Sequence, residues 1–177
     1  MNIAFEKSFK LILAAEGGYT DHPMDHGGPT NLGITISTLS SYLGRAATVN
    51  DVKSLTVAGA KEIYLKKYWN AMHLDLIANE TLQLLLMDQA VNCGNGACTK
   101  RIQKVVGTSQ TLHMDVETIK AINVSDSLKT CFEFIKATQD FYVNIVKNKP
   151  EQKVFLAGWI NRSQKLLDIV RDNVQFK

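Results

Sequence analysis

The chain has 177 residues, of which 45% are hydrophobic and 21% are charged, and its formal net charge at pH 7 is +3. Such a chain can bury the core of one compact domain, and its composition is that of an ordinary globular protein. Three cysteines, Cys93, Cys98 and Cys131, lack the even number and the CxxC spacing of a disulfide framework or a structural zinc site. No apolar run approaches the ~20 residues that span a bilayer, so stable membrane insertion is not expected.

The charges are unevenly spread along the chain. Residues 95–177 carry 13 Lys and Arg residues against 8 Asp and Glu residues, whereas residues 1–94 carry 7 against 9. A basic second half suits a polyanionic partner such as cell-wall glycan, nucleic acid or a membrane surface, although such an imbalance is more often a solvated face without a partner. Glu6, Lys7 and Lys10 interrupt the apolar residues of the N-terminus, which predicts a chain without a signal peptide that is made in the cytosol.

The first predicted element is a helix over residues 4–15. Phe5, Phe9 and Ile12 recur at helical spacing and form one apolar face. Glu16 lies four residues after Ile12 and continues this face, and two glycines then end the helix. The carboxyl group of Glu16 is therefore expected at the edge of the core.

A loop and a short β segment follow. Turn-forming residues fill positions 20–29, and the string TNLGIT at residues 30–35 predicts a short strand or the return arm of a small hairpin. All later segments have helical patterns, over about 35–44, 57–68, the stretch after Asn79, two shorter segments near 96–107 and 114–123, and two long ones at 125–147 and 151–170.

These patterns predict a mainly α protein with one small β-hairpin near residues 19–35. The helix after Asn79 is apolar nearly all round, which is typical of a buried central helix. Without a linker, repeat or low-complexity tract, the chain is expected to be a single domain over residues 1–177. Its catalytic half would be residues 1–90, and a helical half, residues 91–177, would pack on it.

Glu16 is the first candidate for chemistry. Desolvation of a carboxyl group favours its protonated form, and a carboxylic acid that keeps its proton near neutral pH is what glycoside cleavage needs. Asp21 and Asp25 come five and nine residues later, close enough to supply a second carboxylate across a narrow cleft. Spacing alone does not assign their roles, and a glutamate that merely caps or salt-bridges the helix end is the alternative.

Four separated strings carry a resemblance to a known family. The string EGGYTDHPMDHGGPTNLGIT at residues 16–35 resembles the signature EGGY…DP…D.GG.TN.GIT of the bacterial and phage N-acetylmuramidases of glycoside hydrolase family 108. The family's next block is similar to LTVAGAKEIYLKKYW at residues 55–69. Its C-terminal peptidoglycan-binding-like half opens with a pattern similar to residues 84–107, and GWINR at residues 158–162 resembles another characteristic string.

The resemblance implies a lysozyme-like fold and hydrolysis of the β-1,4 bond between N-acetylmuramic acid and N-acetylglucosamine. It places the catalytic glutamate at Glu16 and the family's second aspartate at Asp25, which would position water or stabilise positive charge. Two departures stand out. Asp21 and His22 precede the proline where family members commonly have Asn-Asp, and the DG..GP.T element of the second half is reduced to residues 111–122. The second departure puts independent peptidoglycan binding by that half in doubt.

Further site residues are expected around this pair. The spacing from Glu16 to Asp25 resembles that of inverting phage lysozymes, whose water-positioning threonine would come one residue after Thr30, so Thr30 joins the catalytic set as a weaker match. The expected substrate-binding residues, mainly side chains that can shape the cleft or contact the sugar, are Tyr19, Asp21, Asn31, Tyr68, Trp69 and Asn92.

The chemistry needs neither cofactor nor metal, since it is proton transfer with charge stabilisation. His22 and His26 lack a third spaced ligand. The resulting hypothesis is a monomeric phage-type endolysin. It would be made in the host bacterial cytoplasm and act on peptidoglycan in the cell wall, after a holin-type partner has permeabilised the membrane.

Three other functions are alternatives to this hypothesis. One is a catalytically inert peptidoglycan-binding or scaffold domain, and another is a lytic transglycosylase, which also needs one acid. The third is a nucleic-acid-binding helical protein, but the chain lacks a Lys/Arg-dense helix or interleaved aromatic and basic residues, so no nucleic-acid partner is expected.

Overall fold

The computed structural model describes residues 3–16, 18–20 and 28–175. The chain divides into two compact units, Met1–Ala71 and Met72–Lys177. The two halves expected from the sequence, residues 1–90 and 91–177, stay a prediction. Within the described residues the chain is mainly α with one two-stranded antiparallel sheet, as the sequence predicts.

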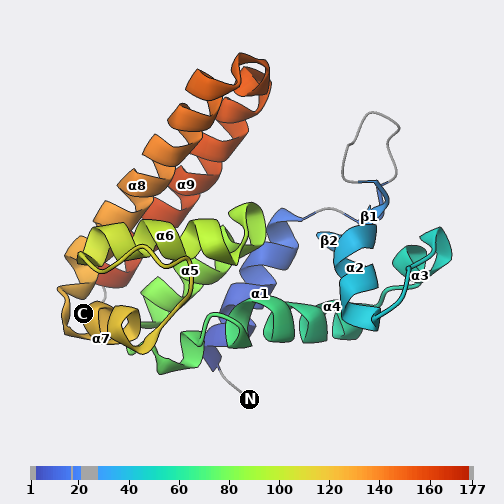
Figure 1. Cartoon of the computed structure of the whole chain (residues 1–177), viewed down its shortest axis with the longest axis horizontal. Helices are drawn as coiled ribbons and strands as arrows, with labels where there is room; N and C mark the ends of the chain where they lie inside the picture. Colours follow the sequence, from blue (N-terminus) through green and yellow to red (C-terminus); the bar gives the residue numbers. More distant parts are fainter. Residues whose placement is uncertain (1–2, 17, 21–27, 176–177) are drawn as a thin grey trace. The chain divides into compact units, whose positions relative to one another are not determined.

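Figure 1 shows the elements of the two units in chain order. The first unit contains α1 (Ile3–Ala15), β1 (Thr30–Asn31), β2 (Ile34–Thr35), α2 (Ile36–Leu43), α3 (Val49–Lys53), α4 (Val57–Tyr64) and the π-helical turn η1 (Leu65–Asn70). The second unit contains the short helix η2 (Leu74–Leu76), α5 (Glu80–Cys93), α6 (Asn95–Val106), α7 (Val116–Val124), α8 (Ser127–Asn148), the short helix η3 (Pro150–Gln152) and α9 (Lys153–Gln175).

The core of the first unit forms where α1 meets α4 and η1. Phe5 and Phe9 of α1 are 3% and 4% exposed. The ring of Phe5 lies edge-on to Trp69 at a centroid distance of 5.4 Å, and the ring of Phe9 lies edge-on to Tyr64 at 5.5 Å. Such edge-to-face pairs add to the free energy gained by burying the aromatic surface. They fix the end of α1 relative to the aromatic face of α4 and η1.

The small sheet is a hairpin closed by a two-residue turn. Asn31 pairs with Ile34, and the two residues between them, Leu32 and Gly33, have φ angles of 52° and 74°. Two positive φ angles are those of a type I′ turn, the form that matches the twist of a hairpin. A leucine in this region costs about 1–2 kcal/mol. The Tyr64 hydroxyl donates a 3.1 Å hydrogen bond to the Leu32 carbonyl and so helps to hold the strained turn.

Helix ends follow the signals in the sequence, with one helix missed. Thr35, Thr56 and Asn79 cap α2, α4 and α5 as expected, each accepting a hydrogen bond from the backbone N–H three residues later. Sequence patterns did not predict α3, which is only five residues long. It begins with a capping box in which the side chains of Thr48 and Asp51 each bond the other's backbone N–H.

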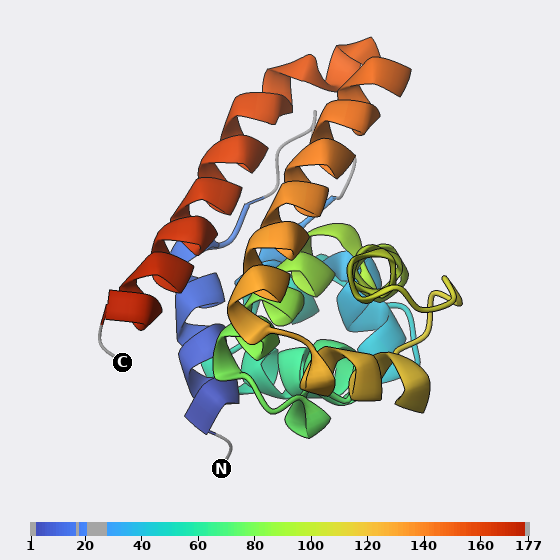
Figure 2. The ribbon, with the colours of Figure 1, turned by 90° about the vertical axis from the view of Figure 1, so that its left-hand side faces the viewer.

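Helix α5 is the buried centre of the second unit, as its all-round apolar pattern predicts. Five of its side chains are wholly buried, namely Leu82, Leu85, Leu86, Met87 and Ala90. Helices α6, α8 and α9 pack against it. Helices α8 and α9 lie side by side as an antiparallel hairpin that turns at η3 (Figures 1 and 2), and Pro150 stands at this turn as expected.

None of the described helices combines the length and the apolar character that crossing a bilayer requires.

Candidate active site

Glu16 stands at the C-terminal end of α1, where the backbone still follows the helix. Its N–H donates a 2.9 Å hydrogen bond to the carbonyl of Ile12, which is 1% exposed. The side chain of Glu16 is half-buried, and so it continues the apolar face of α1 at the edge of the core. This is the placement that the spacing of the sequence predicts.

The turn of the hairpin packs directly on this carboxyl group. A β-carbon on Gly33 would lie 2.8 Å from Glu16 Cγ and 3.1 Å from its carboxyl carbon, and it would also collide with the Tyr64 hydroxyl. Only glycine therefore fits here, both for its positive φ and for the space it leaves. The hairpin forms one wall beside Glu16, and its position against the acid is set by close contact.

Tyr68 forms a second part of the site. It lies in η1, and its ring stands 5.6 Å from that of Tyr64. Burial raises the pKa of the Tyr68 phenol, and the negative charge of nearby Glu16 raises it further, while a hydrogen bond with Thr38 acts in the opposite direction. Short π-helical turns such as η1 are frequent at functional sites. Glu16, Gly33, Thr38, Tyr64 and Tyr68 together are called the hairpin site below.

The polar loop between α1 and the hairpin is closed at its base. Thr20 and Thr30 exchange two backbone hydrogen bonds of 2.8 and 2.9 Å, which form an antiparallel bridge. The two ends of the loop are therefore held together. The Thr30 hydroxyl donates to the Gly28 carbonyl at 3.1 Å. Its observed contact is thus within the loop, and its catalytic role stays a prediction. Asp21 and Asp25, with their expected roles, lie outside the described residues.

Asn31 has a structural contact that its expected role in substrate binding did not include. Its side chain is 8% exposed, and its Nδ2 donates to the Val52 carbonyl at 2.9 Å, with the carbonyls of Lys53 and Leu55 at 3.4 and 3.5 Å. The amide group therefore satisfies carbonyl groups at the C-terminal end of α3 and fastens the hairpin to it.

Tyr19 keeps an exposed ring. Its side chain is 36% exposed, and Lys53 Nζ lies over the ring at 5.2 Å from the centroid. The ring is accessible, and Tyr19 directly precedes Thr20 at the base of the polar loop. Its part in substrate binding stays a prediction, with the opposite face of the ring as the candidate surface for a sugar.

Two expected substrate-binding residues have other surroundings. Trp69 is 1% exposed and packs on Phe5, so its ring belongs to the core and is not open to a sugar. The periodicity of one turn cannot tell which of two adjacent aromatic residues faces inward. Asn92 is exposed in the second unit, where its Nδ2 donates to the Asp88 carbonyl at 2.7 Å. This bond within α5 is the structural role that the sequence already allowed.

The sequence alone did not single out Gly33 or Thr38 as site residues. The glycine in TNLGIT is visible as a turn signal, but its contact with Glu16 depends on how the hairpin folds back. The described residues contain no group of three or more His, Cys, Asp or Glu side chains that could hold a metal ion. The polar groups gathered here are a carboxyl, two phenols and a threonine hydroxyl, which suit proton transfer and hydrogen bonding to a sugar.

Comparisons with known proteins agree with this geometry. Residues 9–94 match the family described as Glycosyl hydrolase 108, and this segment holds the whole hairpin site. No curated protein sequence matches the chain significantly. Among solved structures the chain is similar to the structure of Brucella abortus SagA, with 31% sequence identity and a TM-score of 0.85, over 95% of this chain and 94% of SagA. The expected lysozyme-like fold is thereby confirmed, and the chain belongs to the glycosyl hydrolase 108 family.

Proposed function

We propose that the protein is a peptidoglycan hydrolase that cleaves the β-1,4 bond between N-acetylmuramic acid and N-acetylglucosamine, with Glu16 as its general acid. The observation that carries this proposal is the hairpin site itself. A half-buried carboxyl group ends α1, and the glycine of a strained turn packs against it inside the segment that matches the glycoside hydrolase family. Rigid support of this kind is what a preorganised catalytic acid requires.

The chemical roles follow from the groups at the site. Glu16 would donate a proton to the leaving glycosidic oxygen, while a second carboxylate activates water or stabilises the positive charge on the sugar. Asp25 is proposed for this second role on the sequence resemblance. Tyr68, a neutral phenol beside Glu16, can hydrogen-bond the acid or the sugar without adding charge.

The test is wall lysis with matched variants. Glu16→Gln keeps the shape of the side chain and removes the transferable proton, so turbidity of purified cell walls should stop falling while circular dichroism stays that of the wild type. Asp25→Ala should lower the rate by about 10²-fold or more, whereas Asp21→Ala should act more mildly through loop order. A folded Glu16→Gln variant that keeps turnover within about tenfold of the wild type would remove Glu16 from the mechanism.

The products distinguish hydrolysis from the related eliminating reaction. Mass spectrometry of the released glycan should show reducing N-acetylmuramic acid ends. Anhydro-muramic ends would instead identify a lytic transglycosylase. An unchanged wall, with the protein bound to it, would identify an inert wall-binding domain.

The setting of the reaction is part of the proposal. We propose a monomeric endolysin that is made in the host bacterial cytoplasm and reaches the wall after a holin-type partner permeabilises the membrane. Expressed alone in bacteria, the protein should accumulate without lysis, and lysis should follow once the inner membrane is permeabilised. Its basic second half should strengthen binding to the anionic wall, and that attraction should weaken as salt is raised because surface charges are screened within ~8 Å at physiological ionic strength. Spontaneous lysis on expression would contradict this setting.

A further inference from the structure

The second unit has a groove of its own between α6 and α8. It has a volume of about 590 Å³, and its lining comes from these two helices and from Gln110. Two small side chains, Ala97 of α6 and Ala137 of α8, stand in its wall and leave room there. No residue of the hairpin site lines it, so the proposed glycoside chemistry does not account for it.

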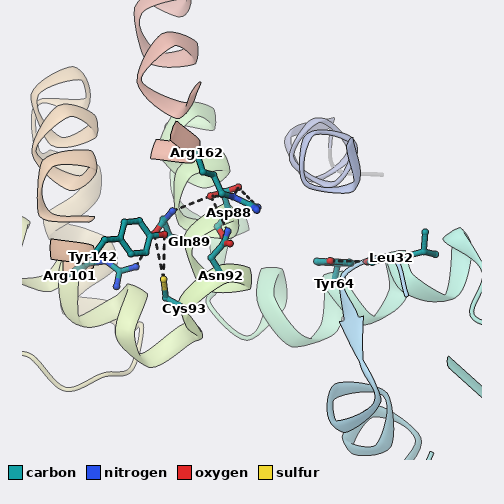
Figure 3. A network of polar contacts seen from close by, with 9 residues as sticks. All are labelled: Leu32, Tyr64, Asp88, Gln89, Asn92, Cys93, Arg101, Tyr142 and Arg162. Atoms are coloured by element: carbon teal, nitrogen blue, oxygen red, sulfur yellow. Dashed lines mark hydrogen bonds and ion pairs between the residues drawn. The ribbon is translucent and has the colours of Figure 1, made fainter. Parts of the chain in front are cut away.

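A buried positive charge lies in the wall of this groove. Arg101 is 7% exposed, and its guanidinium group lies over the ring of Phe141, 4.4 Å from the centroid. Its Nη2 donates to Gln89 Oε1 at 3.2 Å, and Figure 3 shows Arg101 next to Gln89 and Tyr142. Its Nε and Nη1 are buried and have no hydrogen-bond partner among the residues that the structure describes.

This arrangement is unfavourable for the chain by itself. A buried guanidinium normally faces a carboxylate or has all its N–H groups satisfied, because taking a charge out of water costs several kcal/mol unless it is compensated. Here the hydrogen-bond partner of Arg101 is the neutral amide oxygen of Gln89. Phe141 adds a cation–π contact, which is worth less than an ion pair. An anionic group in the groove would compensate the charge.

The rim of the groove shows what kind of anion fits. Lys100, Lys104 and Lys136 are exposed, and none of them has an ion pair or hydrogen bond within the described part of the chain. Two carboxylates, Glu133 and Asp140, stand among them in the same lining. A polyanion such as nucleic acid would be repelled by these carboxylates. A ligand that carries a carboxylate and, a few bonds away, an amine can pair with both signs.

We infer that the α6–α8 groove binds a short peptide segment that bears a free carboxylate and an amine. The carboxylate pairs with Arg101 in the wall of the groove and with Lys136 at its rim, and the amine pairs with Asp140 or Glu133. The choice of the cell wall as the source of this peptide rests on the proposed function, since the peptides that cross-link peptidoglycan carry both groups. The groove would then hold the peptide part of the substrate, separately from the glycan.

Calorimetric titration of the full chain with the free tripeptide Ala-Glu-Lys tests the proposal. Binding is expected. Arg101→Met should weaken it by about 10- to 100-fold, the usual worth of a charge-assisted hydrogen bond, and Lys136→Ala, which removes an exposed charge, by up to about fivefold. Lys120→Ala is the matched control, because it removes an exposed lysine of α7 that does not line the groove. Arg101→Met should fold, since it keeps an apolar stem over Phe141 and removes an uncompensated charge. Lys136→Ala, at an exposed position, serves as the test if that variant does not fold.

Three results would overturn the inference: no binding of the tripeptide, equal binding by the wild type and the two groove variants, or binding of inorganic phosphate as tight as that of the peptide. A peptide in which the carboxyl groups are amidated should not bind, and equal binding of this peptide would also count against the carboxylate. The tripeptide contains no sugar, so the measurement is independent of glycan cleavage. If the protein cleaves glycan but does not bind the peptide, the peptide-binding role of the groove is wrong and the proposed function stands. If it binds the peptide but does not cleave glycan, the proposed function is wrong and the peptide-binding role stands.

Discussion

Gly33 lies against the side chain of Glu16, with its α-carbon placed so that a β-carbon would come 2.8 Å from Glu16 Cγ. The two residues are 17 positions apart, and one ends a helix while the other turns a hairpin. Their contact makes the hairpin a support for the carboxyl group. A change at Gly33 should therefore disturb the acid even though Gly33 has no reactive group.

Gly33→Ala should damage both stability and activity. The positive φ of 74° costs about 1–2 kcal/mol for any residue with a β-carbon, and overpacking against Glu16 and Tyr64 should add about 1–3 kcal/mol. Gly44→Ala is the matched control, because Gly44 has a φ of 68° but open space around it. Urea unfolding and wall lysis should both show the larger loss at Gly33. Equal losses in the two variants would mean that contact with Glu16 is unimportant.

Removal of the Asn31 amide should loosen the hairpin. Asn31→Ala removes the buried donor to the Val52 carbonyl, which then keeps the longer 3.3 Å bond from the Leu55 N–H, and should cost about 1 kcal/mol of unfolding free energy. Asn31→Asp should cost at least as much, because an acceptor would then face the Val52 carbonyl. Thermal unfolding measures both. If Asn31 instead serves only the substrate, the two variants will keep the wild-type melting temperature and lose only activity.

The ion pair between Asp88 and Arg162 should be worth far more than a surface pair. Asp88 is 2% exposed, and the Arg162 side chain meets its carboxylate at 2.8 to 3.3 Å (Figure 3). Arg162→Met leaves the buried Asp88 carboxylate without its ion-pair partner and should lower the free energy of unfolding by about 3–5 kcal/mol. Arg171→Met breaks an exposed pair with Asp168 and should cost less than about 1 kcal/mol. Asp88→Asn combined with Arg162→Met should recover part of the loss in a chemical denaturation series.

Stability should fall at high pH, in part through Tyr68. Its pKa is raised in the folded chain, first by burial and then by the charge of Glu16, so folding favours the protonated phenol. The contribution is fully present below the phenol's ordinary pKa of about 10 and is lost as the pH rises above it. Urea unfolding at pH 8 and pH 11 should show a smaller alkaline loss in Tyr68→Phe than in the wild type. An identical loss in both proteins would show that Tyr68 does not contribute to the loss of stability at high pH.

The three thiols should differ in reactivity. Burial raises the pKa of Cys98 and of Cys131 to about 12 each, and both side chains are closed to solvent. Cys93 is partly exposed. Because the thiolate is the reactive form, a thiol reagent at pH 8 should label Cys93 first and the other two only on unfolding. Cys93→Ser should abolish the fast phase. A fast phase that persists in this variant would contradict the burial of the other two.

The sequence by itself determined the positions of most helices and the place of Glu16, because these depend on residues close together in the chain. The apolar spacing along α1 placed Glu16 at the edge of the core, and Thr35, Thr56 and Asn79 marked helix starts because a cap depends only on residues three positions apart. The apolar stretch of α5 identified the central helix for the same reason. The five-residue helix α3 gave too short a pattern to be seen.

Tertiary structure decided what these elements do to one another. The placing of Gly33 on Glu16, the bonds from Asn31 to carbonyls more than 20 residues away, and the burial of Trp69 all depend on which distant segments pack together. Arg162 and Arg101 look alike in the sequence, yet one meets a buried carboxylate and the other a neutral amide. Side-chain periodicity fixes a face of a helix, but the partner that face meets is set by long-range packing, which no local pattern contains.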